Sequence, residues 1–177
     1  MLRIPFTIIL GVVIFFANTV EAATLFFTPG TGEFGLSKEI VVNLKIDSDG
    51  VGVNAGQATI RFPKEMLEVK SVDKADSAFN FWLEEPSFSN TDGVITFVGG
   101  TPYGISGASI KVLHITFLTK SAGTAVLSFA DSAVTSSDGS GTNVLSKSSE
   151  AGFTITGETI PPVITPPTQI KREPVAP

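Results

Sequence analysis

The 177-residue chain contains no cysteine, one histidine, one tryptophan and one tyrosine. Without cysteine it has no disulfide framework, no thiolate nucleophile and no cysteine-based metal site. Common enzyme motifs are also missing: there is no Gly-x-Ser-x-Gly, no His-Glu-x-x-His and no phosphate-binding glycine loop. We therefore expect a protein that is not an enzyme and has no catalytic residues.

Basic clusters are equally scarce. Lysine and arginine number 12 against 17 aspartates and glutamates, giving a net charge of −5, and the only adjacent basic pair is Lys171-Arg172. Proteins that bind nucleic acid carry basic patches that neutralise phosphates. A nucleic-acid partner is therefore not expected.

The first 22 residues have the layout of a secretory signal peptide. Arg3 supplies a positive start, Ile4 to Ala17 are almost wholly apolar, and Val20-Glu21-Ala22 offers a cleavage site. The apolar stretch is shorter than the roughly 20 residues that span a bilayer. An uncleaved anchor is the alternative. Whether the segment is a cleaved signal or an uncleaved anchor, we expect a secreted or cell-surface protein whose only membrane contact is through this segment.

Residues 158–177 form a proline-rich tail that opens with Pro161-Pro162 and Pro166-Pro167. Prolines fix φ and remove N–H donors, so the tail is expected to be an extended, semi-stiff linker. Two explanations remain open: the chain is a truncated part of a longer anchored protein, or the tail is itself an interaction segment.

Residues 23–157 alternate between apolar and polar side chains, as β-strands with one buried face do. Four such runs are centred on Ile40–Ile46, Ala58–Phe62, Leu113–Phe117 and Ala125–Phe129, and Phe153 with Ile155 closes the series. Three Asp-Gly pairs predict tight turns, at 49–50, 92–93 and 138–139. Residues 99–104 read as a longer loop, and residues 63–67 as a single helical turn. The pattern predicts an all-β fold, a two-sheet antiparallel β-sandwich of about nine strands with jelly-roll or Ig-like topology.

Four segments in this order resemble the cohesin family. They are residues 55–69, which end in Leu-Glu-Val, residues 107–117 with an Ile-x-Phe pair, residues 122–129 and residues 137–144. The resemblance implies a nine-stranded sandwich that is shared with some carbohydrate-binding modules. It also implies a non-catalytic module that binds the calcium-loaded helices of a dockerin-like protein on one sheet face.

Because the resembling domains dock partners on their third strand, the row Gln57, Thr59 and Arg61 is the candidate partner-binding face. Its alternative is an ordinary solvated sheet face. Type I cohesins present an Asn and an Asp there, whereas Ala55 and Gln57 occupy the matching positions of this chain. That difference leaves open whether the partner on this face is a standard dockerin or a different ligand.

Two other functions stay open. Trp82 and Tyr103 are candidate sugar-stacking residues if both rings face solvent, which would make the chain a carbohydrate-binding module with a polysaccharide partner. The absence of a strong site and the proline-rich tail also fit a structural spacer of a surface protein.

Metal ligands are sparse. Asp47-Ser48-Asp49-Gly50 resembles the start of an EF-hand loop, but position twelve is Ala58, which favours a solvated turn. Asp131, Asp138 and Asn143 are weak calcium candidates if they gather around one loop. His114 has no partner at metal-ligand spacing and is expected to be an ordinary strand residue. Apart from that calcium, no cofactor is expected.

Overall fold

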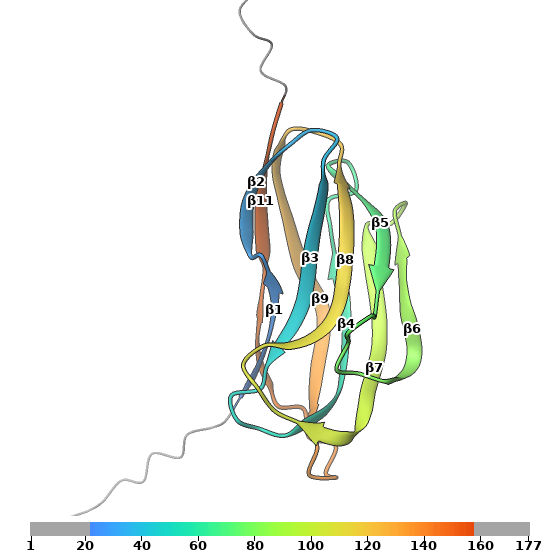
Figure 1. The fold of residues 1–177 in the computed structure, drawn as a ribbon, viewed down its shortest axis with the longest axis vertical. Coiled ribbons are helices and arrows are strands. Elements are labelled where there is room, and N and C mark those ends of the chain that lie inside the picture. The colour runs from blue at the N-terminus through green and yellow to red at the C-terminus, as the bar shows by residue number, and fades with distance from the viewer. Residues whose placement is uncertain (1–21, 158–177) are drawn as a thin grey trace, which may run out of the picture.

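The computed structural model describes residues 22–157, which form two β-sheets packed face to face (Figure 1). The strands are β1 (Ala23–Thr28), β2 (Thr31–Gly35), β3 (Glu39–Asp47), β4 (Val53–Arg61), β5 (Leu67–Asp73), β6 (Phe81–Ser89), β7 (Val94–Ile105), β8 (Ile110–Thr119), β9 (Gly123–Ser136), β10 (Leu145–Ser149) and β11 (Ala151–Thr156). One sheet has the order β10-β1-β3-β8-β5 and the other β2-β11-β9-β4-β7-β6. The predicted all-β sandwich is confirmed.

The structure has eleven strands where about nine were expected, and one of the two extra strands arises because the first strand region changes sheets. β1 belongs to the five-stranded sheet and β2 to the six-stranded one, with a cis Thr28-Pro29 bond between them. β1 runs parallel to β10, and β2 runs parallel to β11. These two short parallel pairs make otherwise antiparallel sheets mixed, and they cover one side of the sandwich.

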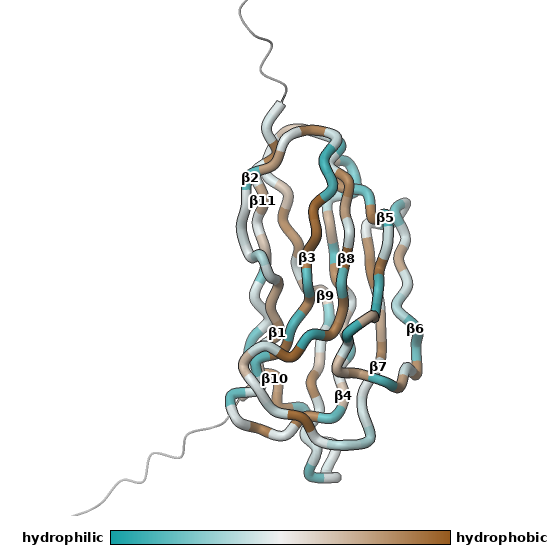
Figure 2. The backbone as a smooth tube through the Cα atoms, in the orientation of Figure 1, coloured by the Kyte–Doolittle hydropathy of each residue, from teal (hydrophilic) through white to brown (hydrophobic). Residues whose placement is uncertain are grey.

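Alternation along the strands builds the core that the sequence predicted. Ile40, Val42, Leu44 and Ile46 of β3 are at most 2% exposed, and Phe117 of β8 is fully buried. Apolar and polar residues follow one another along these strands (Figure 2). The ring of Phe117 meets that of Phe62 edge to face, with centroids 5.6 Å apart. The large phenylalanine content therefore fills the space between the sheets without polar tips that need partners.

Bulges interrupt the regular alternation in several strand pairs. The pairing of β3 with β8 shifts between Leu44 and Lys45, so that Val112 and Leu113 are both buried although they are adjacent. The pairing of β4 with β9 shifts between Thr59 and Ile60. An extra residue in one strand re-aims every side chain beyond it, which a strict period of two cannot anticipate.

The predicted turns are present at all three Asp-Gly pairs, where Gly50, Gly93 and Gly139 have φ of 84°, 69° and 82°. The single helical turn is also confirmed, because the N–H of Leu67 donates to the carbonyl of Pro63 at 2.9 Å. The loop expected at residues 99–104 is wrong in part. Residues 99 and 100 are paired strand residues of β7, and only residues 101–104 bulge outward opposite Asn54.

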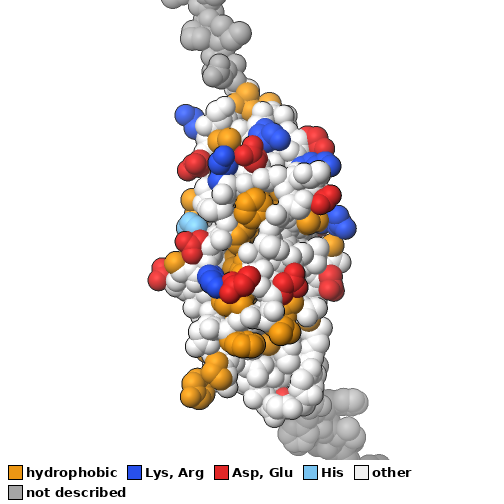
Figure 3. All heavy atoms as spheres, turned by 90° about the vertical axis from the view of Figure 1, so that its right-hand side faces the viewer, with side chains coloured by type: hydrophobic (Ala, Val, Ile, Leu, Met, Phe, Trp, Pro, Cys, Tyr) orange, Lys and Arg blue, Asp and Glu red, His pale blue; other side chains and the backbone are white. Residues whose placement is uncertain are grey.

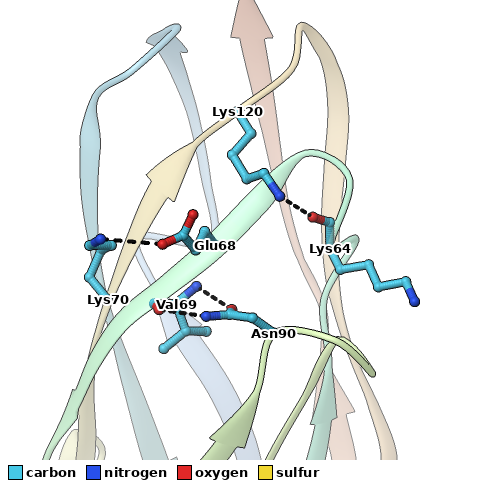
Figure 4. A network of polar contacts seen from close by, with 6 residues as sticks. All are labelled: Lys64, Glu68, Val69, Lys70, Asn90 and Lys120. Atoms are coloured by element: carbon cyan, nitrogen blue, oxygen red, sulfur yellow. Dashed lines mark hydrogen bonds and ion pairs between the residues drawn. The ribbon is translucent and has the colours of Figure 1, made fainter.

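On the side of the sandwich bounded by β5 and β6, one side chain links the edge of β5 to the turn after β6. Asn90, in the turn after β6, accepts a hydrogen bond from the N–H of Val69 at 2.8 Å and donates one to its carbonyl at 3.0 Å (Figure 4). The amide thus takes the place of a neighbouring strand on the outer edge of β5. Every buried side-chain nitrogen and oxygen among residues 22–157 has a hydrogen-bond partner.

The signal peptide expected at 1–22 and the proline-rich tail expected at 158–177 lie outside the described residues, apart from Ala22. Within residues 22–157 no helix is long and apolar enough to cross a membrane.

Candidate functional site

The outer face of β9, β4, β7 and β6 carries the predicted partner row. Along β4 the buried positions are Gly56, Ala58 and Ile60, which leaves the side chains of Gln57, Thr59 and Arg61 outward. Gln57 lies opposite Val98 of β7, and Thr59 lies opposite Thr96 and Asp131. The structure thus brings the three predicted residues together on one exposed face, although this placement does not test whether they bind a partner.

An apolar hollow of about 590 Å³ lies on the same outer face, next to that row on the side of Ala55, which precedes Gln57 on β4. Its main apolar lining comes from three adjacent strands: Ala55 of β4, Val98, Gly100 and Pro102 of β7, and Phe81 and Leu83 of β6. Phe81 is 63% exposed and Leu83 is 78% exposed. Figure 3, which views the β5–β6 side, shows apolar side chains grouped on the lower half, with acidic side chains and a basic one directly above them.

Local backbone features create this hollow. The pairing of β6 with β7 shifts between Trp82 and Glu84, so Leu83 is an extra residue that projects from the sheet. Gly100 is paired on one side with Ala55 and on the other with Phe81. A Cβ on Gly100 would lie far closer to the carbonyl oxygen of Asn54 than van der Waals contact allows, so only glycine fits there. At Gly99 and Gly100 the hollow is therefore lined by backbone alone, while Leu83 projects on its β6 side.

A smaller polar cleft of about 170 Å³ adjoins the hollow along the strands, and Val98 lines both. Glu84 and Asp131 stand at its two sides, and Gln57, Thr59 and Thr96 lie between them. The hydroxyl of Thr96 donates to Glu84 Oε1 at 3.2 Å. No lysine or arginine lines either depression, although Arg61 lies two residues beyond Thr59 on β4.

Trp82 does not face solvent as the sugar-stacking interpretation required. It lies opposite Gly99, on the inward side of β6, and is half-buried against the core. Its ring meets Phe79 and Phe97 edge to face, with centroid separations of 6.0 and 6.2 Å. Tyr103 is 79% exposed on the outward bulge of β7. The two rings therefore do not form one exposed platform.

We expect Trp82→Ala to lower the free energy of unfolding by about 2–4 kcal/mol, because it removes a ring packed on Phe79, Phe97 and Gly99. Tyr103→Ala should change stability by less than about 0.5 kcal/mol, since its ring is exposed. Urea denaturation of the two variants measures both effects. Equal stability of the two variants would contradict the inward placement of Trp82.

The three weak calcium candidates are not gathered. Asp131 lies opposite Thr59, about five strand residues or roughly 17 Å from the end of β9, beyond which Asp138 lies. Asn143 Oδ1 instead accepts hydrogen bonds from the N–H groups of Val134 and Leu145, each at 3.1 Å. Among residues 22–157, no group of three acidic or histidine side chains could hold a metal ion.

Asp138 is held by its own turn. Its carboxylate accepts hydrogen bonds from the hydroxyl of Ser140 at 2.6 Å and from the N–H of Ser140 at 2.9 Å. These bonds favour the charged form and lower the pKa of Asp138 from its ordinary value. The side chain therefore acts as a turn-forming group.

The remaining polar candidates are structural. Asp47 Oδ1 accepts from the N–H of Asp49 at 3.0 Å, which makes the EF-hand-like segment a short turn. Ser48 is buried, and its hydroxyl accepts from the N–H of Gly107. His114 is half-buried on the outside of the other sheet, with Nδ1 3.1 Å from Asn43 Oδ1.

Sequence reasoning missed the hollow itself. Phe81, Leu83, Val98 and Pro102 were not candidates, because their exposure depends on which faces of β6 and β7 the strand pairing turns outward. One signal was available: the pair Gly99-Gly100 between β-forming residues indicates a site where backbone approaches backbone or ligand closely.

No protein-family model matches this sequence, and no curated protein matches it. Several solved structures, however, are similar to this chain in fold. The seventh ScaB type I cohesin from Pseudobacteroides cellulosolvens superposes with a TM-score of 0.64 at 17% identity, covering 86% of this chain and 99% of that one. CaCohA2 from Clostridium acetobutylicum is 21% identical with a TM-score of 0.59, covering 77% and 92%. The non-cellulosomal cohesin from Archaeoglobus fulgidus is 18% identical with a TM-score of 0.58, covering 76% and 91%.

Some of the similar structures are complexes. One is a type I cohesin–dockerin complex, Coh-OlpC–Doc435 from Clostridium thermocellum, with a TM-score of 0.61 at 14% identity, covering 77% of this chain and 95% of that chain. These likenesses agree with the resemblance that the sequence motifs indicated. Residues 22–157 of this chain therefore form a domain with the cohesin fold.

Proposed function

We propose that this chain is a non-catalytic attachment module that works outside the cytoplasm and binds a dockerin-type protein. The observation that carries the proposal is the outer face of β9, β4, β7 and β6. It combines the exposed row of Gln57, Thr59 and Arg61 with an exposed apolar hollow. Contiguous apolar surface rimmed by polar residues is typical of protein interaction sites.

The similar structures support this choice of partner, because several are cohesins bound to dockerins. The sugar-binding alternative receives no such support, since Trp82 is packed inward. An extracytoplasmic location agrees with the signal-like residues 1–22.

The test is a binding assay with the full chain and a panel of calcium-loaded dockerins, including every dockerin encoded in the same genome. At least one should bind saturably. Gln57→Arg places a long charged arm at the centre of the face and should weaken that binding by 10-fold or more. Thr116→Arg, on the outside of the opposite sheet, is the matched control and should leave the affinity unchanged.

Two results would overturn the proposal. One is the absence of binding by any dockerin in the panel. The other is an equal effect of Gln57→Arg and Thr116→Arg, which would place the partner elsewhere.

A further inference from the structure

We propose that the proline-rich tail binds back onto its own domain, with Lys171-Arg172 over the acidic cleft and Pro174-Val175 in the apolar hollow. The inference goes beyond the proposed function, because it gives the outer face of β9, β4, β7 and β6 an occupant from the same chain. It follows from charge complementarity, from the order of the two depressions and from the length of the tail.

Charge complementarity favours the basic pair. The carboxylates of Glu84 and Asp131 flank the cleft, and neither belongs to an ion pair among residues 22–157. The nearest cation of the row, Arg61, lies two residues beyond Thr59 and does not line the cleft. The acids therefore outnumber the cation, and they attract a segment of opposite charge. Lys171-Arg172 is the only adjacent basic pair of the sequence.

The hollow suits the residues that follow the basic pair. Its β6 side is formed by Phe81 and Leu83, which are 63% and 78% exposed. Proline-rich segments bind against exposed aromatic and apolar side chains, because their extended backbone is ordered before binding. Burial of Pro174-Val175 leaves one backbone donor fewer to satisfy, since proline has no N–H. The carboxamide of Asn54, which also lines the hollow, can donate to a carbonyl of the tail.

The order of the two depressions matches the order of residues in the tail. β11 ends at the upper end of the sandwich in Figure 1, and the apolar group of Figure 3 lies in the lower half. Along β4, Gln57 of the cleft is closer to that upper end than Ala55 of the hollow. A tail that runs down this face reaches the cleft first and the hollow second. In the sequence, Lys171-Arg172 likewise precede Pro174-Val175.

The length of the tail also fits. Ile155 lies opposite Gly123 of β9, and Asp131 lies about eight strand residues farther along. With the two residues from Ile155 to Gly157 the path is about ten strand residues, or roughly 33 Å. Lys171 follows Gly157 by fourteen positions. A chain reversal takes about four residues, and the remaining ten span about 31 Å as polyproline II and up to about 36 Å when fully extended. The basic pair therefore reaches the cleft.

The covalent link makes even a weak contact effective. A segment tethered close to its site is present at an effective concentration of about a millimolar, so a contact too weak to join separate molecules is populated within one chain. A partner that uses the same face must displace the tail. Its apparent affinity then falls in proportion to the fraction of chains whose face is free.

The first experiment measures where the tail lies in the full chain. Because the chain has no cysteine, Gln169→Cys provides a single attachment point for a nitroxide spin label. The amide NMR signals of Thr59, Thr96 and Val98 should lose intensity, whereas that of Thr116 on the opposite sheet should not. In 1 M salt, where the Debye length is about 3 Å, the loss should shrink at least about 2-fold. Equal loss on the two sheets, or none on either, would overturn the proposal.

A mixing experiment separates the chain's own tail from that of a second copy. Isotope-labelled chains without the spin label are mixed with unlabelled chains that carry it at position 169. No intensity loss is expected at Thr59 or Val98 in this mixture. A loss equal to that within one spin-labelled chain would place the tail of a second copy on the face and overturn the proposal.

Charge exchange tests the contact over the cleft. In the spin-labelled chain, Lys171→Glu/Arg172→Glu should lower the ratio of docked to free tail by about 3- to 10-fold. Adding Glu84→Lys should recover about 2-fold or more of that loss. The matched control is Glu39→Lys, an equal change of net charge on β3 of the other sheet, which should recover nothing. Equal recovery by the two lysines would overturn the contact with the cleft.

A second pair of variants tests the hollow. Leu83→Asp should lower the ratio of docked to free tail by about 5-fold or more, because it removes apolar surface that the tail covers. Val41→Asp is the control, since Val41 is 43% exposed on β3 of the other sheet. Equal effects of the two variants would show that the tail does not use the hollow.

The outcomes for the tail and for the proposed function are distinguishable. If the spin-label pattern is as expected but no dockerin binds, the tail inference stands and the proposed function fails. If a dockerin binds in a Gln57-dependent way but no amide loses intensity, the tail inference is overturned and the proposed function stands. If both hold, Lys171→Glu/Arg172→Glu should tighten dockerin binding by about 2- to 5-fold, because the face is then free more often.

Discussion

Replacing Phe117 by alanine is expected to lower the free energy of unfolding by about 3–5 kcal/mol, the largest effect of any change suggested for this chain. Phe117 is fully buried on β8, inside the five-stranded sheet, and its ring packs edge to face against Phe62. The substitution opens a cavity between the sheets, and β8 is fixed between β3 and β5, so it cannot close the gap. A loss of this size is a large part of the total stability of an ordinary domain.

Urea denaturation and thermal melting measure this effect, and the melting temperature should fall by roughly 10–20 °C. The matched control is Phe88→Ala on β6, where the side chain is 43% exposed. That variant should lose less than about 1 kcal/mol, because much of its ring is already in water. Comparable losses in the two variants would show that the aromatic contacts of the core do not determine stability.

Asn90→Ala is expected to cost about 2–3 kcal/mol, although Asn90 is neither in a strand nor in the apolar core. Its amide makes both hydrogen bonds to the backbone of Val69, at 2.8 and 3.0 Å. Alanine leaves this part-buried N–H and C=O without partners. It also removes a link between the edge of β5 and the turn that follows β6. Chemical denaturation gives the loss, and amide hydrogen exchange at Val69 should accelerate more than exchange in β3.

Asn90→Asp is the sharper comparison. A carboxylate still accepts from the Val69 N–H but faces the Val69 carbonyl oxygen with no proton to donate. The pKa of this introduced aspartate should therefore be raised in the folded state, so the folded protein binds a proton more readily than the unfolded one. Stability relative to the original protein should then recover as pH falls through the raised folded-state pKa, and the recovery should be complete near the unfolded-state value of about 4. A pH-independent difference between the two proteins would contradict this role of the amide.

Several features could be predicted from the sequence because they depend on local patterns. The buried row Ile40, Val42, Leu44 and Ile46 follows from alternation alone, and the turns at Gly50, Gly93 and Gly139 follow from a need for positive φ. The row Gln57, Thr59 and Arg61 was placed on the outer face for the same reason. Side-chain direction in a regular strand is set by the strand itself.

Other features could not be predicted because they depend on pairing between distant segments. Which face of β6 points inward is fixed only when β6 pairs with β7: Trp82 lies opposite Gly99 and points inward, while Phe81 and Leu83 are exposed. The exposure of Trp82 was predicted wrongly for this reason. The separation of Asp131 from Asp138 is likewise a matter of how far β9 extends.

The amino-acid sequence by itself determined the class of fold, the main buried faces, the turns and the exclusion of cysteine chemistry. These properties follow from residue type and from a period of two along single strands. Only the tertiary structure decided where the apolar hollow lies, which aromatic ring is exposed, and that Asn90 caps the edge of β5. Each of these depends on strand register and on which edges are left open. Register is fixed by the packing of the two sheets as a whole, and a shift of one residue reverses the direction of every side chain beyond it.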